Sequence, residues 1–118
     1  MARLKVSIVF ASGARVGPGK ATLLESIRDT GSISAAARDM GMSYKRAWVL
    51  LDSMNRAFSQ PVVEAVAGGT HGGGAVLTPF GDELLVRYRR MLTAAETAAA
   101  DDLAALARAA LPDAGPKV

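Results

Sequence analysis

The sequence predicts a mainly α-helical fold with a small β-hairpin wing, that is, a winged helix-turn-helix followed by a long C-terminal dimerisation helix. Two short helical segments meet at Gly41, and two apolar runs flank a glycine-rich stretch at residues 68–74. Residues 82–111 contain neither glycine nor proline and are rich in alanine, which favours one long helix. Helices, then a hairpin, then a terminal helix is the order of a winged helix.

The chain has 118 residues, enough for one domain with its own hydrophobic core. We expect that domain over residues 1–111, including the long helix at about 79–111, and a flexible tail at 112–118. Its net charge of +3 and isoelectric point near 9.7 are compatible with a nucleic-acid partner without requiring one.

The composition argues against several classes of protein. There is no cysteine, which excludes disulfides and thiolate metal sites, and a single histidine leaves no ligand set for a metal. No cofactor is expected, and no catalytic constellation is present, so we expect no enzyme. No segment approaches the length that spans a membrane, and we expect a cytoplasmic protein.

The N-terminal segment alternates apolar and polar residues, which predicts a half-buried strand over residues 3–11 rather than a signal peptide. Residues 12–19 are typical of a loop. Pro18 can open a first helix, which Thr30 and Gly31 would end. The apolar members of the alternating strand are Leu4, Val6, Ile8 and Phe10.

The next stretch has the layout of a helix-turn-helix. A short helix over residues 33–40 would turn at Gly41, and Ser43 would cap a second helix that runs towards Ser59. Lys45 and Arg46 fall in the first turn of that second helix, the part that enters the DNA major groove in such motifs. The alternative is an ordinary helical hairpin with a solvated basic turn.

Helical spacing divides the second helix into two faces. We expect one face to be buried, and Trp48, at its boundary, to be buried as well. Tyr44 lies on the buried face, although its hydroxyl could instead reach a phosphate. The expected buried residues are Tyr44, Ala47, Leu51, Met54 and Phe58, and the expected outward residues are Lys45, Val49, Asp52, Ser53 and Arg56, with Arg46 beside them. Lys45 and Arg46 are candidates for base or phosphate contacts, Val49 for a thymine methyl group and Arg56 for a phosphate.

Two predicted strands, residues 62–67 and 75–78, form the wing around the glycine-rich loop. The N–H groups of this loop could bind a phosphate, and the loop is slim enough to follow a minor groove. Taken by itself, however, the loop is better interpreted as a mobile hairpin tip. Further expected DNA contacts are Lys20, Ser32, Ser43, Tyr44, Thr70, His71, Gly72 and Gly73.

The last helix should begin with Thr78 as its cap and Pro79 in its first turn. Apolar residues recur along it at seven-residue spacing, which favours a homodimer. The alternative is a helix folded back on its own domain. The expected dimerisation residues are Leu85, Tyr88, Leu92, Ala95, Ala99 and Leu106.

Residues 18–92 resemble the N-terminal DNA-binding domain of the ModE family of molybdate-responsive transcription regulators. The resemblance is carried by Gly31-Ser-Ile-Ser34, Ser43-Tyr-Lys45, Ala47-Trp48, Met54-Asn55 and the wing run Gly72-Gly-Gly-Ala-Val-Leu-Thr78. LysR-like regulators share the general layout but not that wing. The resemblance implies a dimer that binds a palindromic operator in double-stranded DNA, with the wing in contact.

Regulators of the ModE family also carry C-terminal molybdate-binding domains, whereas this sequence stops after its long helix. We therefore expect no molybdate sensing by this chain alone. Either a separate effector-sensing protein supplies the sensor, or the chain responds to another signal or to none. The rival interpretations are an architectural or weakly sequence-specific DNA-binding protein and a winged-helix protein-interaction module.

Overall fold

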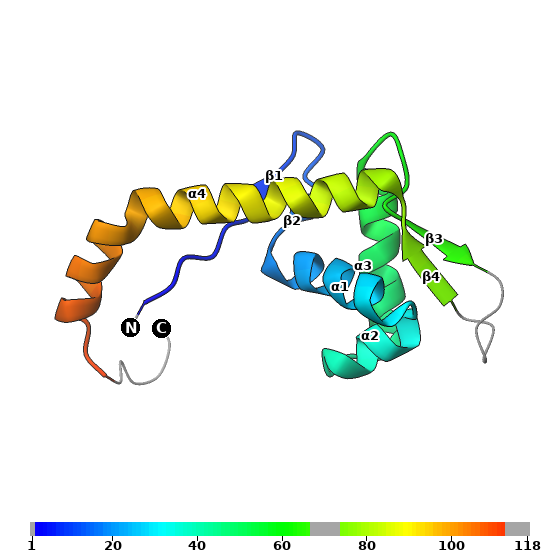
Figure 1. Ribbon diagram of the computed structural model, residues 1–118, viewed down its shortest axis with the longest axis horizontal. Helices are drawn as coiled ribbons and strands as arrows, with labels where there is room; N and C mark the ends of the chain where they lie inside the picture. Colours follow the sequence, from blue (N-terminus) through cyan, green and yellow to red (C-terminus); the bar gives the residue numbers. More distant parts are fainter. Residues whose placement is uncertain (1, 67–73, 113–118) are drawn as a thin grey trace.

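The computed structural model describes residues 2–66 and 74–112. It is mainly helical, with two small antiparallel hairpins and a long C-terminal helix, so the predicted winged-helix-like fold class is confirmed (Figure 1). The elements in chain order are β1 (Ile8–Val9), β2 (Arg15–Val16), α1 (Pro18–Thr30), α2 (Ile33–Asp39), α3 (Tyr44–Ala57), β3 (Val63–Val66), β4 (Gly74–Leu77) and α4 (Pro79–Ala109).

The core lies between α1, α2, α3 and the first half of α4, which crosses above the other three helices in Figure 1. Leu23, Leu24 and Ile27 of α1 are fully buried, as the apolar stripe of that helix predicts. Removing side chains of this size from water contributes about 1.5–3 kcal/mol each to folding. The core therefore holds α3 in place through its buried face.

The predicted helix ends are confirmed where the local chemistry is strong. Gly31 ends α1 in a left-handed conformation (φ 70°), and its N–H donates to the carbonyl of Ile27 at 2.8 Å. Gly41 (φ 67°) makes the turn between α2 and α3. The Oγ of Ser43 caps α3 by accepting the N–H of Arg46 at 3.0 Å. α2 ends at Asp39, one residue before its predicted end.

The predicted strand over residues 3–11 was too long, and the predicted loop at 12–19 contains a strand. Only Ile8 and Val9 pair, with Val16 and Arg15 respectively, through a tight turn at Gly13 (φ 91°). The expected alternation of burial is present, but residues 2–7 belong to no strand because they have no neighbouring strand. The Tyr88 hydroxyl of α4 holds this segment instead, by donating to the Val6 carbonyl at 2.6 Å.

The wing strands β3 and β4 are antiparallel, with Val63 opposite Leu77 and Val66 opposite Gly74. The hairpin is attached to the turn between α1 and α2, because the Ala75 N–H donates to the Gly31 carbonyl at 3.0 Å. A Cβ atom at position 74 would lie 2.9 Å from the Cγ2 of Val66 on the paired strand, so glycine suits this point of the wing. The wing therefore has a set position beside the helix-turn-helix.

The cap of α4 is confirmed, since the Oγ1 of Thr78 accepts the N–H of Gly81 at 2.9 Å. A Cβ atom at Gly81 would lie 2.1 Å from the Val62 carbonyl oxygen, so the start of α4 packs directly on the wing backbone. The helix continues to Ala109, and its second half extends past the three-helix core (Figure 1). Among the described residues, no helix has the length and apolarity needed to cross a membrane.

Two of the expected dimerisation residues lie in the interior of the domain. Leu85 and Tyr88 are buried in the core of their own chain, so their side chains are not available to a partner. The first half of α4 folds back on its own domain, which was the alternative left open from the sequence. The bond of Tyr88 to Val6 and the pairing of Arg89 with Glu25 of α1, Nε to Oε2 at 3.0 Å, fasten it there.

Candidate nucleic-acid interface

The first turn of α3 presents its side chains to solvent. Ala47, Leu51 and Met54 are buried and fix the rotation of the helix about its axis, as predicted. Lys45 and Val49 consequently point outwards, and Val49 is 58% exposed. The capped end of α3 therefore offers a basic and partly apolar surface beside the wing.

Lys45 and Arg46 are exposed, and neither takes part in an ion pair within residues 2–66 and 74–112. Positive charge at a helix N-terminus is unfavourable, because the helix dipole already places partial positive charge there. Arg56 differs, since its guanidinium pairs with the Asp52 carboxylate at 2.8 Å. Such an exposed pair contributes at most about 1 kcal/mol, so Arg56 can exchange this partner for a phosphate at little cost.

The prediction that Trp48 is buried was wrong, and of the two alternatives left open for Tyr44, the structure favours an exposed side chain. Tyr44 is 50% exposed and Trp48 is 40% exposed. Their rings pack edge to face, with centroids 6.3 Å apart. Where α2 and α3 meet, the small side chains of Ala36, Ala37 and Ala47 fill the core, so two large rings at this end of α3 lie outside it.

Lys20 has partners inside the domain. Its ammonium donates to the Arg15 carbonyl at 2.8 Å and to the Ser53 hydroxyl at 2.9 Å. It thereby ties β2 and the start of α1 to α3. Ser53, expected on the outward face, is half-buried and turned towards Lys20.

Ser32 acts as the N-cap of α2, since its Oγ accepts the Ala35 N–H at 3.1 Å. It also forms a β-bridge with Gly74 at the start of β4. Ser32 therefore lies where the helix-turn-helix and the wing join. The remaining expected wing contacts, Thr70, His71, Gly72 and Gly73, lie outside the described residues.

Asn55 positions the wing, and its role was not foreseen. Its Oδ1 accepts the N–H groups of Val62 at 2.7 Å and Val63 at 3.3 Å, and its Nδ2 donates to the Val63 carbonyl at 3.4 Å. One amide side chain thus couples the angle of β3 to that of α3. The sequence does contain a signal for this role. An asparagine in the last turn of a helix, shortly before Pro61, can supply an acceptor to backbone N–H groups that follow the helix.

All three phenylalanines of the chain form one cluster, which the sequence analysis also missed. The ring of Phe58 packs against Phe10 with centroids 5.2 Å apart and against Phe80 at 5.1 Å, both edge to face. The cluster joins the end of α3 to the N-terminal hairpin and to the start of α4. It holds the end of α3 opposite to the exposed basic turn.

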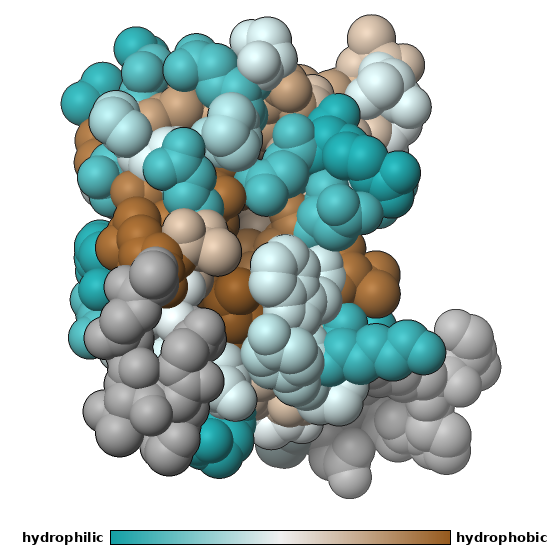
Figure 2. All heavy atoms as spheres, turned by 90° about the vertical axis from the view of Figure 1, so that its right-hand side faces the viewer, coloured by the Kyte–Doolittle hydropathy of each residue, from teal (hydrophilic) through white to brown (hydrophobic). Residues whose placement is uncertain are grey.

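Figure 2 views the end of the molecule that carries the wing, where hydrophilic side chains surround hydrophobic patches. Val66 and Val76 of the wing are among the exposed apolar residues. No group of three or more histidine, cysteine or acidic residues in the described part of the chain could hold a metal ion.

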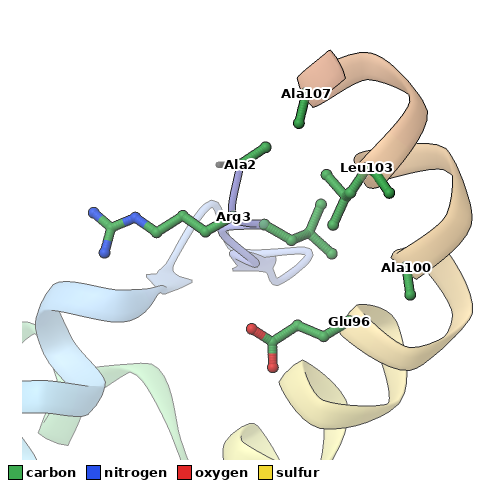
Figure 3. Close-up of a pocket in the computed structure, with 8 residues that line it drawn as sticks. Ala2, Arg3, Glu96, Ala100, Leu103 and Ala107 are labelled. Carbon is green, nitrogen blue, oxygen red and sulfur yellow. The ribbon is translucent and has the colours of Figure 1, made fainter.

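The far half of α4 lies at the other end of the molecule. A hollow of about 340 Å³ separates residues 2–4 from an alanine-lined side of this helix (Figure 3). Ala95 and Ala99 are half-buried, and Leu106 is 69% exposed. Of the expected dimerisation residues, these three and the half-buried Leu92 remain accessible.

The chain is similar to several proteins named for molybdenum, although no protein-family model matches it. It is 53% identical over 81 residues to the molybdenum-pterin-binding protein MopB of Rhodobacter capsulatus, which is 69% of this chain and 30% of that protein. It is 40% identical over 87 residues to the molybdenum transport protein ModE of Azotobacter vinelandii (74% and 32%). It is 45% identical over 71 residues to the DNA-binding transcriptional dual regulator ModE of Escherichia coli (60% and 27%).

The matched part of the chain spans only about a third of the length of these relatives. Across about 70% of this chain, the matches support the ModE-like, molybdate-related family that the sequence resembles. The relatives are named for regulation, transport or binding of molybdenum-pterin and carry no enzyme name.

Proposed function

We propose that this chain is a cytoplasmic DNA-binding transcription regulator of the ModE type, which binds a palindromic operator as a dimer. One observation carries the proposal: two exposed cations, Lys45 and Arg46, stand at the capped N-terminus of α3, beside a wing whose position is set by hydrogen bonds. A polyanion in front of this turn offsets the unfavourable placement of both charges.

In this proposal α3 enters the major groove with its N-terminal turns. Lys45 and Arg46 reach base edges or phosphates, and a guanidinium or ammonium can bind the O6 and N7 acceptors of guanine. Val49, which is exposed one turn after Lys45, contacts a thymine methyl group. Arg56 lies farther along the helix and exchanges Asp52 for a phosphate.

The wing follows the neighbouring minor groove, with contacts from the loop at residues 68–74. For two other expected contacts, the hydrogen bonds support an indirect role. Lys20 holds α3 through Ser53, and Ser32 holds the wing through Gly74, so both orient the DNA-contacting elements. In this proposal each of them also adds a contact to the DNA backbone.

A dimer of this chain would use the far half of α4. Leu92, Ala95, Ala99 and Leu106 are accessible there, whereas Leu85 and Tyr88 are not. Small alanine side chains allow two helices to approach closely. A twofold dimer presents its two α3 helices to successive major grooves on one side of the duplex, about 34 Å apart.

Selection of duplexes from a random pool by the wild-type chain tests the function. We expect an inverted repeat whose half-sites lie about one DNA turn apart, and much weaker binding of shuffled duplexes at moderate salt. Equal affinity for selected and shuffled duplexes would point to an architectural protein. Very weak affinity for every duplex would point to a protein-interaction module.

A further inference from the structure

Tyr44 and Trp48 form a partly exposed aromatic pair on the surface of α3. Within residues 2–66 and 74–112, neither the Tyr44 hydroxyl nor the Trp48 indole N–H forms a hydrogen bond with a protein group. Aromatic side chains of this size are usually buried, because their rings remove a large apolar area from water. Two such rings side by side at the surface, each with a free polar atom, indicate a contact with another molecule.

The position of Asn55 shows which side of α3 carries the pair. Trp48 and Asn55 are seven residues apart, which is two helical turns, and Tyr44 lies one turn before Trp48, so the three occupy one side of the helix. Asn55 is bonded to Val62 and Val63 at the entry of β3. The aromatic pair is therefore on the side of α3 that faces the wing, and α3 and the wing stand next to each other in Figure 1.

This side of α3 faces a particular part of a DNA duplex if the proposed function is right. The sugar-phosphate backbone is the ridge between the major and the minor groove. With α3 in the major groove and the wing at the minor groove, that ridge must pass between the two elements. The wing-facing side of α3 then meets sugars and phosphates, whereas Lys45 and Val49 face the groove floor.

We infer that Tyr44 and Trp48 form an uncharged clamp on this backbone ridge, a specific extension of the DNA-binding function proposed above. The phenol O–H and the indole N–H donate to phosphate oxygens, and the ring bodies cover deoxyribose carbons. Edge-to-face packing at 75° holds the two rings relative to each other, so little side-chain freedom is lost on binding. The clamp sets the depth of α3 in the groove and reads no base.

Two conservative variants test the clamp without exposing new surface. Trp48→Phe removes the indole N–H and keeps an apolar ring, and Tyr44→Phe removes only the hydroxyl. We expect each variant to bind a labelled duplex selected by the wild-type chain about 3- to 10-fold more weakly, the range for one lost hydrogen bond. Because the clamp is uncharged, the dependence of affinity on salt should stay as in the wild type, whereas Lys45→Ala should lower that slope by about 1.

A shuffled duplex and a remote variant complete the design. A backbone clamp predicts the same fold-loss on the shuffled duplex as on the selected duplex, and no loss for Leu111→Ala, an exposed apolar residue beyond the end of α4. Trp48 is the only tryptophan of the chain, so its fluorescence should change on saturation with either duplex.

The outcomes separate the clamp from the proposed function. Wild-type affinity in both phenylalanine variants, a loss confined to the selected duplex, or an unchanged Trp48 fluorescence would overturn the clamp and leave the DNA-binding function standing. No binding of either duplex by the wild-type chain would overturn the function and the clamp together.

Discussion

The two tyrosines of this chain lie on helices with similar apolar spacing but differ in burial. Tyr88 of α4 is fully buried and donates its hydroxyl to the Val6 carbonyl at 2.6 Å. Tyr44 of α3 is half exposed, and its ring packs edge to face with that of Trp48. From the sequence, Tyr44 was placed on the buried face with a phosphate contact as an open alternative, and Tyr88 was expected at a dimer surface. The structure instead buries Tyr88 and leaves Tyr44 half exposed.

The difference comes from what each helix lies against. The first half of α4 covers α1 and the N-terminal segment, both of which supply long-range partners for a large side chain. Where the first turns of α3 meet α2, the buried side chains include the small Ala36, Ala37 and Ala47. Helical spacing therefore indicates which side chains share a face. Whether a large ring on that face is buried depends on the side chains of the element packed against it.

The largest expected effect is on stability, and it separates the two tyrosines directly. Tyr88→Ala should lower the free energy of unfolding by about 3–5 kcal/mol, because it leaves a cavity and loses a buried hydrogen bond. Tyr44→Ala should stay within about 0.5 kcal/mol of the wild type, as expected for a surface site. Urea unfolding at one fixed protein concentration measures both. Equal losses in the two variants would contradict the assignment of Tyr44 to the surface.

The next effect concerns DNA binding through α3. Lys45→Ala and Arg46→Ala should each weaken binding of the selected duplex by about 1–3 kcal/mol, with unfolding unchanged. Arg108→Ala is the matched control, because it removes one exposed positive charge from the last turn of α4. If all three variants lose affinity equally, net charge rather than docking of α3 accounts for binding.

A third prediction tests whether the wing and α3 are coupled through Asn55. Asn55→Ala leaves the N–H groups of Val62 and Val63 without their acceptor, which should cost about 1–3 kcal/mol of stability. Binding of the selected duplex should weaken as well, because the wing is no longer held at a set angle. Asn55→Asp keeps an acceptor oxygen and should retain more stability than the alanine variant. Identical unfolding curves for Asn55→Ala and the wild type would show that the wing is positioned by other contacts.

Local chemistry made part of the fold predictable. Gly41, Ser43 and Thr78 act where the sequence placed them, because a turn or a cap depends on only a few neighbouring residues. Pairing of β1 with β2 was missed because β2 has only two residues and lies in a stretch whose composition is typical of a loop, so the sequence offered no partner for the predicted strand.

The candidate site was predictable to a similar extent. The exposure of Lys45 and Val49 follows from helical periodicity alone. The internal bonds of Lys20 and the role of Asn55 depend on which segments pack against α3, and a single sequence does not specify that arrangement.

The smallest expected effect isolates the hydroxyl that distinguishes the buried tyrosine from the exposed one. Tyr88→Phe keeps the ring in the core and removes only the bond to the Val6 carbonyl, which should cost about 0.5–1.5 kcal/mol at neutral pH. Burial raises the pKa of the Tyr88 hydroxyl above its ordinary value of 10.0, and the neighbouring Arg89 guanidinium acts in the opposite direction.

The pH dependence follows from this raised pKa. Above about pH 10 the unfolded chain releases the Tyr88 proton more readily than the folded chain does, so it binds fewer protons and stability falls. The contribution of the hydroxyl is complete below about pH 10 and is lost as the pH rises through the raised pKa of the folded state. Tyr88→Phe should therefore lose stability less steeply than the wild type on the alkaline side, and unfolding curves of both proteins from neutral pH to beyond pH 10 measure this. Parallel losses in the two proteins would mean that the Tyr88 hydroxyl ionises as easily in the fold as in the unfolded chain.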